Sequence, residues 1–400
     1  MRVLVLDTIH GGQELAHYLG GRGHFTDTVD VYRGRSGIDA ETALARDYDL
    51  AVAPVHLDPA HPFLRELTIP IISHHQAVRW ILGTDIPSPL VEVTGARGKT
   101  TTACALASLM NGPGILHTSL GTFRYPECTL LWRKSITPAS LVPAAREAAR
   151  IQGWCIGEVS LGFTGAGDHG IITSGDDYLF AGGRRHAREE KVRSGQGLPY
   201  LLVAPGIEAP GAVPVVSVAT VQGETCTVRC GGESARFDSP LLSLDGYRMP
   251  LMLAAAAGCR LGADPAGLAS FEALPGRMAA TCEQGVWVVD NANSGTNALT
   301  SCQAAAYARE ISGRDNVTLV IGQEEGAVCE GFSPGEICSA VSDIRPSLLI
   351  LIGEHAQSLA QDPACSAGRI VVCTTLEEGR AQALSLTPVG SVVLAVKSWR

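Results

Sequence analysis

The chain has 400 residues, 46% of them hydrophobic, and a formal net charge of −9. The net negative charge argues against nucleic acid or an anionic membrane as the main partner. No apolar run reaches the roughly 18 residues that a membrane span needs, and the first residues become charged too early, at Asp7, for a signal peptide. We therefore predict a cytoplasmic protein whose partners include neither nucleic acid nor a membrane, and the oligomeric state is left open.

Twelve cysteines occur without a C-x-x-C pair. Most lie in apolar segments, as do Cys104, Cys155, Cys259 and Cys373. We expect them to be small buried hydrophobic residues in a reducing compartment, and not ligands of zinc or of an iron–sulfur cluster.

The first 86 residues alternate apolar strands with helical stretches, which predicts a small parallel α/β domain. The expected strands are Val3–Leu6, Thr28–Val31, Leu50–Ala53 and Ile69–Ile72, and the expected helices are Glu14–Leu19 and His75–Leu82. Residues 84–89, TDIPSP, have the composition of a rigid linker. We place the first domain at residues 1–86.

Residues 91–102, VEVTGARGKTTT, form the most informative motif. An apolar strand ends in a glycine turn and a helix follows, so Gly95 and Gly98 let the backbone approach a polyphosphate closely. Lys99 can reach the β- and γ-phosphates, and the Thr100 hydroxyl is placed to bind Mg²⁺. The predicted nucleotide-binding residues of this loop are Gly95, Ala96, Arg97, Gly98, Lys99, Thr100 and Thr101.

Two further α/β domains are predicted around and after this motif. The second, residues 87–274, has expected strands at Ile156–Val159, Gly170–Thr173 and Tyr200–Val203, a hairpin at Cys226–Cys230/Glu233–Phe237 and an alanine-rich helix at Pro250–Arg260. The third, residues 275–400, begins at Pro275-Gly-Arg277 and has expected strands at Val286–Val289, Val317–Ile321, Leu348–Leu351, Ile370–Cys373 and Val392–Val396.

Lysine is scarce, because only four of the 31 lysine and arginine residues are lysine. A lysine kept among so many arginines is a candidate for chemistry that arginine cannot perform. The alternative is chance survival at the surface. The four residues are Lys99, Lys134, Lys191 and Lys397.

From residue 90 onward, the motifs resemble the Mur ligase superfamily, which includes the amide ligases of peptidoglycan synthesis and folylpolyglutamate synthetase. The resemblance rests on the TGARGKTT loop and on the segments Thr118–Phe123 and Thr137-Pro138. It implies an α/β fold of three domains: an N-terminal Rossmann-like domain, a central P-loop ATPase domain and a C-terminal dinucleotide-fold-like domain that closes over ATP.

The resemblance also implies ATP and Mg²⁺ as cofactors and assigns roles to single residues. Glu158 resembles the glutamate that holds Mg²⁺ together with Thr100, and Lys191 resembles the lysine that some members carbamylate to bridge a second Mg²⁺. Arg277 resembles the arginine that reaches the γ-phosphate, and Asp290 an aspartate near the nucleotide. The expected catalytic residues are Lys99, Glu158, Lys191 and Arg277. For Lys191, the alternative is an ordinary surface lysine in a charged helix.

Two departures from the superfamily pattern are present. Its D-x-x-H-x-P segment has Asn293 in place of the histidine and Gly295 in place of the proline. Its Asp-His pair reads Asp176-Asp177. These changes leave the second metal site and the contacts to the nucleoside unassigned.

The N-terminal segments LVLDTIHGG, VDVYRG, APVHLDP and ISHHQAV resemble the methanogen ligase family that completes the nickel tetrapyrrole coenzyme F-430. This implies that ATP activates a carboxylate of a seco nickel hydrocorphinate acid as an acyl phosphate, and that a carbon of the same macrocycle attacks it to close a ring. Nickel would enter only as part of the substrate. The alternatives are a Mur-type ligase that joins an amine or amino acid to a carboxylate, and an ATP-switched binding protein.

Three histidines are candidate substrate contacts. His10, His74 and His75 fall at or just beyond expected strand ends of the first domain, where open α/β sheets bind ligands. They could contact the macrocycle or its carboxylates, including an axial bond to nickel, and the alternative is local hydrogen bonding. The basic residues that could pair with substrate carboxylates are Arg22, Arg33 and Arg35.

Overall fold

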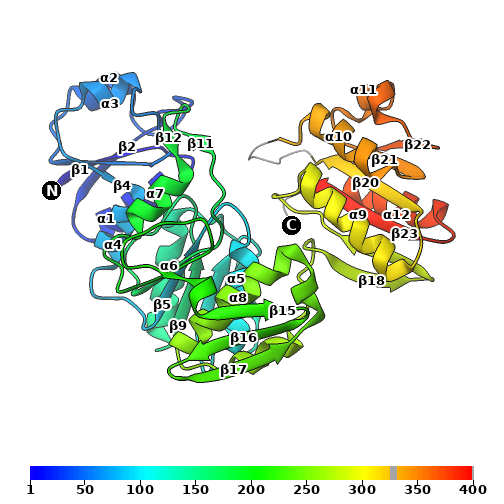
Figure 1. The fold of residues 1–400 in the computed structure, drawn as a ribbon. Coiled ribbons are helices and arrows are strands. Elements are labelled where there is room, and N and C mark those ends of the chain that lie inside the picture. Colours follow the sequence, from blue (N-terminus) through cyan, green and yellow to red (C-terminus); the bar gives the residue numbers. More distant parts are fainter. Residues whose placement is uncertain (325–330, 399–400) are drawn as a thin grey trace. The chain divides into compact units, whose positions relative to one another are not determined.

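The computed structural model describes residues 1–324 and 331–398 and divides into two compact units, residues 1–271 and 272–400 (Figure 1). The first unit contains two parallel or mostly parallel sheets, and the second unit contains one. Among the described residues, no helix is long and apolar enough to cross a membrane. The mixed α/β architecture predicted from the sequence is confirmed, and the finer division at residue 86 stays a prediction.

A four-stranded parallel sheet with the order β2-β1-β3-β4 opens the first unit. Its elements are β1 (Arg2–Leu6), α1 (Gly12–Gly21), β2 (Phe25–Val29), α2 (Ala40–Leu44), β3 (Leu50–Ala53), α3 (Pro62–Glu66), β4 (Ile71–Ser73) and α4 (His74–Leu82). Strand β2 begins before the expected residue because its polar Thr26 and Asp27 lie on an edge strand. The chain moves outward in opposite directions from β1 and β3, so the loops after these two strands border the crevice at which such sheets bind ligands.

Helices α1 and α4 join this sheet to the rest of the unit. Helix α4 begins with a capping box between Ser73 and Gln76. Leu15 of α1 and Ile81 of α4 share one buried core with α6 (Pro138–Arg150). Each fully buried side chain of this size contributes about 1.5–3 kcal/mol, so this shared core fixes the first sheet against its neighbour.

The second sheet has eight strands in the order β14-β13-β10-β5-β9-β6-β7-β8, and its central strands are parallel. The strands are β5 (Leu90–Thr94), β6 (Gly114–Thr118), β7 (Gly121–Tyr125), β8 (Thr129–Trp132), β9 (Trp154–Glu158), β10 (His169–Ile172), β13 (Tyr200–Val203) and β14 (Val213–Pro214). The helices are α5 (Lys99–Leu109), α6 and α7 (Ala187–Ser194), and a short hairpin of β11 (Leu179–Phe180) and β12 (Arg185–His186) precedes α7. The antiparallel strands β7 and β8 were missed because their partly exposed residues form no apolar run.

A small antiparallel sheet completes the first unit. It consists of β15 (Ala219–Gln222), β16 (Thr225–Cys230) and β17 (Glu233–Asp238), which confirms the predicted hairpin. Helix α8 (Asp245–Arg260) packs between this sheet and α5. A disulfide joins Cys230 of β16 to Cys259 of α8, so the expectation that Cys259 is a small buried hydrophobic residue is wrong. Cys104, Cys155 and Cys373 are free and buried, as predicted.

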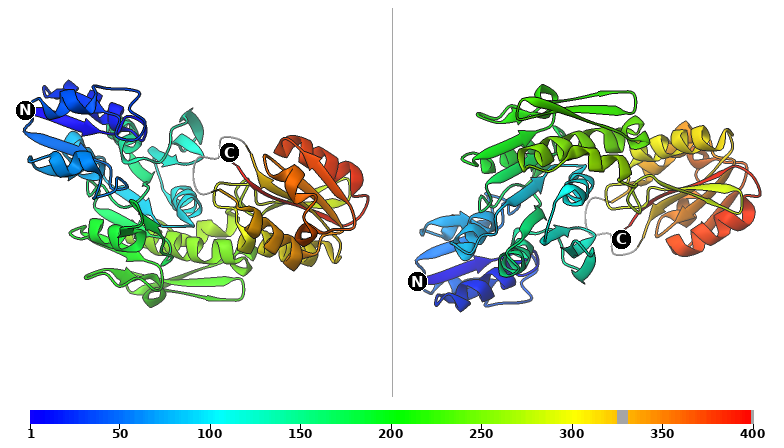
Figure 2. Two further views of the ribbon diagram at one scale, coloured as in Figure 1. Left: turned by 90° about the horizontal axis from the view of Figure 1, so that it is seen from above. Right: turned by 90° about the horizontal axis from the view of Figure 1, so that it is seen from below.

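The second unit is a six-stranded sheet with helices on both faces. Its strands, in the order β18-β19-β23-β20-β21-β22, are β18 (Ala279–Glu283), β19 (Val286–Asp290), β20 (Val317–Gln323), β21 (Leu348–Ile352), β22 (Ile370–Cys373) and β23 (Ser391–Lys397). Helices α9 (Ala298–Ser312), α10 (Pro334–Ile344) and α11 (Ala356–Leu359) pack on one face, and α12 (Leu376–Leu386) packs on the other (Figure 2). All five predicted strands are confirmed, and antiparallel β18 is additional.

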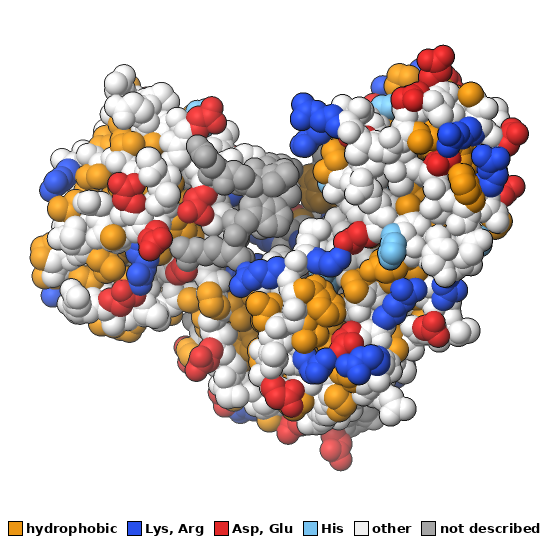
Figure 3. All heavy atoms as spheres, turned by 180° about the vertical axis from the view of Figure 1, so that it is seen from behind, with side chains coloured by type: hydrophobic (Ala, Val, Ile, Leu, Met, Phe, Trp, Pro, Cys, Tyr) orange, Lys and Arg blue, Asp and Glu red, His pale blue; other side chains and the backbone are white. Residues whose placement is uncertain are grey.

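The apolar residues are concentrated in cores on the two faces of these sheets. On the face shown in Figure 3, hydrophobic side chains form groups that are separated by acidic, basic and other polar side chains. The sheets are therefore anchored by buried cores, and the loops at the edges of such sheets are where binding and catalytic residues commonly lie.

Candidate active site

The loop between β5 and α5 has the backbone of a phosphate-binding turn. Gly95 and Gly98 have φ values of 154° and 80°. A Cβ atom at Gly95 would lie 2.0 Å from the hydroxyl oxygen of Thr173, so only glycine fits there. Helix α5 begins at Lys99, and Thr101 is buried in its first turn. The N–H groups at such a helix N-terminus point at an anion, and the helix dipole favours its charge.

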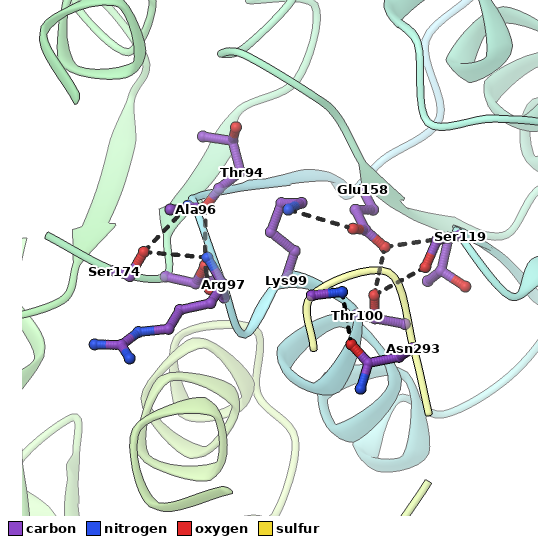
Figure 4. Close-up of polar contacts among 12 residues, drawn as sticks. Thr94, Ala96, Arg97, Lys99, Thr100, Ser119, Glu158, Ser174 and Asn293 are labelled. Carbon is purple, nitrogen blue, oxygen red and sulfur yellow. Dashed lines mark hydrogen bonds and ion pairs between the residues drawn. The ribbon is translucent and has the colours of Figure 1, made fainter. Parts of the chain in front are cut away.

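Glu158 is the centre of the polar contacts beside this loop (Figure 4). Its Oε2 accepts hydrogen bonds from the Thr100 hydroxyl at 2.9 Å and from the backbone N–H of Ser119 at 3.1 Å. The Lys99 Nζ lies 3.8 Å from its Oε1. These residues follow or end β5, β9 and β6, which are neighbours in the sheet. The hydroxyl and carboxylate oxygens suit Mg²⁺, which prefers oxygen ligands, so the residues fit this ion.

Two residues after β10 hold the other side of the loop. The Ser174 hydroxyl accepts hydrogen bonds from the backbone N–H groups of Ala96 at 3.1 Å and Arg97 at 3.3 Å, as Figure 4 shows. The Thr173 hydroxyl donates to the Arg97 carbonyl at 2.5 Å. The Arg97 side chain pairs with Asp176, with 2.7 Å between Nε and Oδ2. Sequence reasoning did not select Thr173 or Ser174 as site residues, although Thr173 ends a predicted buried strand and Ser174 follows it directly.

Lys191 lies on α7 with its amine buried and without a hydrogen-bond partner among the described residues. Its Nζ lies 4.8 Å from the centre of the Tyr178 ring. Burial, and secondarily the charge of Lys99, lower the pKa of Lys191 to about 8. Arg188 and Glu189 on the same helix are exposed. The alternative that Lys191 is an ordinary surface lysine is therefore wrong.

Arg277 and Asp290 lie in the second unit: Asp290 ends β19, and Asn293, in the loop after it, contacts the turn before Arg277. The Asn293 side-chain amide donates to the Gly276 carbonyl at 2.6 Å, and Asp290 accepts the Ala292 N–H at 3.0 Å. A Cβ atom at Gly276, which has φ 71°, would lie 2.5 Å from the Ala292 carbonyl oxygen. Asn293, one of the departures from the superfamily pattern, thus positions the loop that carries Arg277.

His74 and His75 begin α4, and their side chains are buried. The Nε2 of His74 lies 3.0 Å from the Leu6 carbonyl oxygen, and that of His75 lies 2.9 Å from the Ser160 carbonyl oxygen. Burial lowers the pKa of both imidazoles, that of His74 to about 4. Each residue therefore has its Nε2 against a backbone carbonyl inside the unit, and contact of these two residues with substrate stays a prediction.

His10, the third candidate, belongs to a cluster that sequence reasoning did not assemble. Its Nδ1 lies 3.0 Å from Oδ2 of Asp7 and 3.3 Å from Nε2 of His56. The rings of Tyr32 and His56 stack with their centres 5.7 Å apart. The hydrogen bond to Asp7 raises the pKa of His10, whereas burial, and then the charge of His10, lower the pKa of His56 to about 4. His56 and Tyr32 were missed because each follows a different strand.

The three arginines considered for substrate carboxylates differ. Arg22 donates to the Leu82 carbonyl at 3.2 Å and lies 3.8 Å from Asp85, so it braces the end of α4. Its expected role as a partner of substrate carboxylates stays a prediction. Arg33 and Arg35 are exposed in the loop after β2.

The chain is similar to known proteins in both sequence and fold. Residues 280–398 match the family described as "Coenzyme F430 synthetase CfbE, C-terminal domain". The whole chain is 30% identical to coenzyme F(430) synthetase of Methanosarcina acetivorans, with 99% of that protein covered. The fold is similar to that of MurF from Acinetobacter baumannii, with a TM-score of 0.57 and 12% identity over 97% of this chain and 95% of the other. It is also similar to bifunctional folylpolyglutamate synthase/dihydrofolate synthase from Yersinia pestis, with a TM-score of 0.58 and 15% identity over 82% and 90%.

Proposed function

This chain belongs to the coenzyme F-430 synthetase family, and we propose that it closes the last ring of that nickel tetrapyrrole by ATP-dependent ligation. It is a ligase with the three-domain α/β fold of the Mur ligases, so the alternative of an ATP-switched binding protein is set aside. The observation that carries the proposal is the contact of Glu158 with both Lys99 and Thr100 beside a glycine turn, because this arrangement suits phosphoryl transfer from ATP.

The proposed reaction has two steps. A substrate carboxylate oxygen attacks the γ-phosphorus of ATP, the bond between the γ-phosphorus and the bridging oxygen breaks, and ADP and an acyl phosphate form. A carbon of the same macrocycle then loses its proton and attacks the acyl carbon. The new carbon–carbon bond forms as the acyl carbon–oxygen bond breaks and phosphate leaves. The macrocycle thus loses the elements of one water, and no amine is consumed.

Phosphoryl transfer requires that the negative charge of the phosphates be neutralised, and the candidate site residues are assigned to this task. Lys99 is assigned to the β- and γ-phosphates, and Arg277 to the γ-phosphate. Thr100 and Glu158 are assigned to Mg²⁺, which when bound offsets phosphate charge. Asp290 is assigned to the nucleoside end of ATP. The roles of Arg277 and Asp290 rest on the superfamily resemblance.

Lys191 is assigned as a carbamylated lysine. Its neutral amine would add to carbon dioxide, with formation of a nitrogen–carbon bond and release of one proton. Burial without a hydrogen-bond partner, and a pKa of about 8, support this assignment because both favour the neutral amine. The carbamate would add oxygen ligands for a second Mg²⁺.

The test is phosphate release from ATP with and without the seco nickel tetrapyrrole acid, with the mass and absorbance of the macrocycle followed in the same sample. We expect phosphate release that depends on the macrocycle, with loss of one water from it. Release that requires an added amine would identify the amide-ligase alternative and reject the ring closure.

A further inference from the structure

A cluster of polar and aromatic residues lies at the carboxyl edge of the first sheet, apart from the phosphate loop. Asp7 directly follows β1, Tyr32 comes after β2, and His56 comes after β3. Strands β1 and β3 are neighbours, and the chain leaves them toward opposite edges of the sheet. Open α/β sheets bind ligands at this point, so the cluster occupies the place where a ligand of this sheet is expected.

The cluster has the donor atoms of a transition-metal site. One ligand atom from each of Asp7, His10 and His56 lies within 4.8 Å of the other two, and imidazole is a favoured ligand of nickel. Asp7, however, is fully buried, and both of its carboxylate oxygens already accept hydrogen bonds. Its oxygens accept hydrogen bonds from the N–H of Ile9 at 2.6 Å and the N–H of His10 at 3.1 Å, besides that from the His10 ring.

Asp7 therefore orients His10 and has no free oxygen to offer a ligand. A carboxylate that holds one ring nitrogen of a histidine is the usual partner of a metal-binding imidazole. The other nitrogen of His10, Nε2, has no hydrogen-bond partner among residues 1–324 and 331–398, and its side chain is 41% exposed. This leaves one oriented imidazole nitrogen available.

We propose that His10 binds the nickel of the tetrapyrrole substrate as an axial ligand through Nε2, with Asp7 and His56 as positioning residues. The proposal rests on the proposed function, which makes a nickel tetrapyrrole the substrate. The macrocycle fills the four equatorial positions of its nickel, so one protein nitrogen is enough to engage it. A free nickel ion would need several protein ligands, and Asp7 cannot be one of them because its oxygens already accept hydrogen bonds.

The surroundings match a macrocycle that carries carboxylates. Tyr32 is 40% exposed, and its ring centre lies 5.4 Å from that of His10, edge to face. Arg33 and Arg35 follow it in a loop whose backbone N–H groups bond Asp30 at 2.9 Å and 3.0 Å. Their exposed guanidinium groups suit carboxylates, and Tyr32 supplies an aromatic face.

The same loops are tied to the candidate active site within the first unit. The Arg185 side chain, just before the helix that carries Lys191, donates to the Val55 carbonyl at 3.1 Å, next to His56. On the other side, Gly11 packs against the first turn of α6. Figure 1 shows α7 and the β11–β12 hairpin beside the first sheet. A nickel anchor at His10 would therefore hold the macrocycle against the unit that contains the phosphate loop.

The test is binding without ATP, using the nickel tetrapyrrole acid and its metal-free counterpart as probes. We expect the wild-type protein to prefer the nickel form. The variant His10→Gln should raise the Kd for the nickel form by about tenfold or more and leave that for the metal-free form unchanged. Nickel X-ray absorption should show imidazole scattering in the wild-type complex and lose it in the variant. His17→Gln, an exposed histidine of α1, is the matched control.

Asp7→Asn tests the positioning role, because asparagine tolerates the left-handed backbone (φ 84°) of this position. It should alter the nickel spectrum and weaken nickel-dependent binding by about 10-fold or more while the protein stays folded. An unchanged preference for nickel in His10→Gln would overturn the proposal, as would tight binding of free Ni²⁺ to the wild-type cluster. If the wild-type protein preferred the nickel form but did not close the ring, the proposed function would be rejected and the proposed nickel ligation would still hold.

Discussion

The two sheets of the first unit both place polar groups at the carboxyl ends of parallel strands, but they do so differently. At the second sheet, the phosphate loop comes from consecutive residues, and Glu158 contacts it from the next strand. At the first sheet, Asp7 and His10 share one loop, and His56 comes from a loop more than forty residues further along the chain. The comparison shows that a loop made of neighbouring residues can be found in a sequence, whereas a cluster made of distant loops requires the sheet topology.

The largest expected effect is at the phosphate loop. Lys99→Met should lower macrocycle-dependent phosphate release by about 10²–10³-fold or more, because the charge that forms on the transferred phosphoryl group loses its nearest cation. The measurement is single-turnover phosphate release at saturating ATP. Lys134→Arg is the control, since it keeps the ion pair with Glu14. Near-normal phosphate release by the Lys99 variant would show that the phosphate loop takes no part in the reaction.

Lys191→Arg should lower turnover by about 10²-fold, because arginine keeps a positive charge and cannot form a carbamate. In the wild-type protein, the neutral amine becomes scarcer as pH falls below the pKa of about 8. Activity should therefore rise with pH up to about 8 and then level off, and added bicarbonate should restore it most clearly on the acid side. Equal turnover of wild type and variant at all pH values would show that Lys191 is not modified.

Gly95→Ala should weaken ATP binding and destabilise the fold by about 1–3 kcal/mol, because the new methyl group collides with Thr173. Gly112→Ala is the matched control, since Gly112 also has a positive φ but open space around it. ATP titration and denaturant unfolding measure the two effects. If both variants behaved alike, backbone strain alone, and not the close approach to Thr173, would set the requirement for glycine.

The smallest expected effects separate the buried histidines from His10. His74→Ala should lower the free energy of unfolding by about 1–3 kcal/mol by removing a buried hydrogen bond, and His10→Gln should leave it nearly unchanged. Because the folded state holds His74 neutral down to about pH 4, the unfolded state binds more protons below about 6.5. Stability should fall as pH drops through that range, and less steeply in His74→Ala. Equal pH dependence in the two proteins would contradict this account.

Much of the fold follows from apolar periodicity, since most of the predicted strands, such as β5, β20 and β23, are buried parallel ones. The glycine turn was recognised from a short motif, and Glu158 was selected through the superfamily resemblance; the structure brings Glu158 to the Thr100 hydroxyl, and their roles stay predictions. Lys191 looked ambiguous, because its neighbours in sequence are charged and only the packing of α7 shows that its amine faces inward.

The remaining features depend on long-range packing. His74 and His75 resemble ligand residues by position, but α4 turns them into the unit. His56 and Tyr32 carry no local signal, and Asn293 acquires its role only because Gly276 lies beside it. Side chains whose partners are distant in sequence were thus the ones that sequence reasoning could not place.

The most direct test of the central claim uses a tetrapyrrole acid whose reacting carboxylate carries heavy oxygen. If an acyl phosphate forms and carbon attacks it, one labelled oxygen will appear in the released phosphate and the other will stay in the new ketone, with one phosphate formed per ring closed. Phosphate without label, or label transfer that requires an added amine, would contradict the ring-closing ligase.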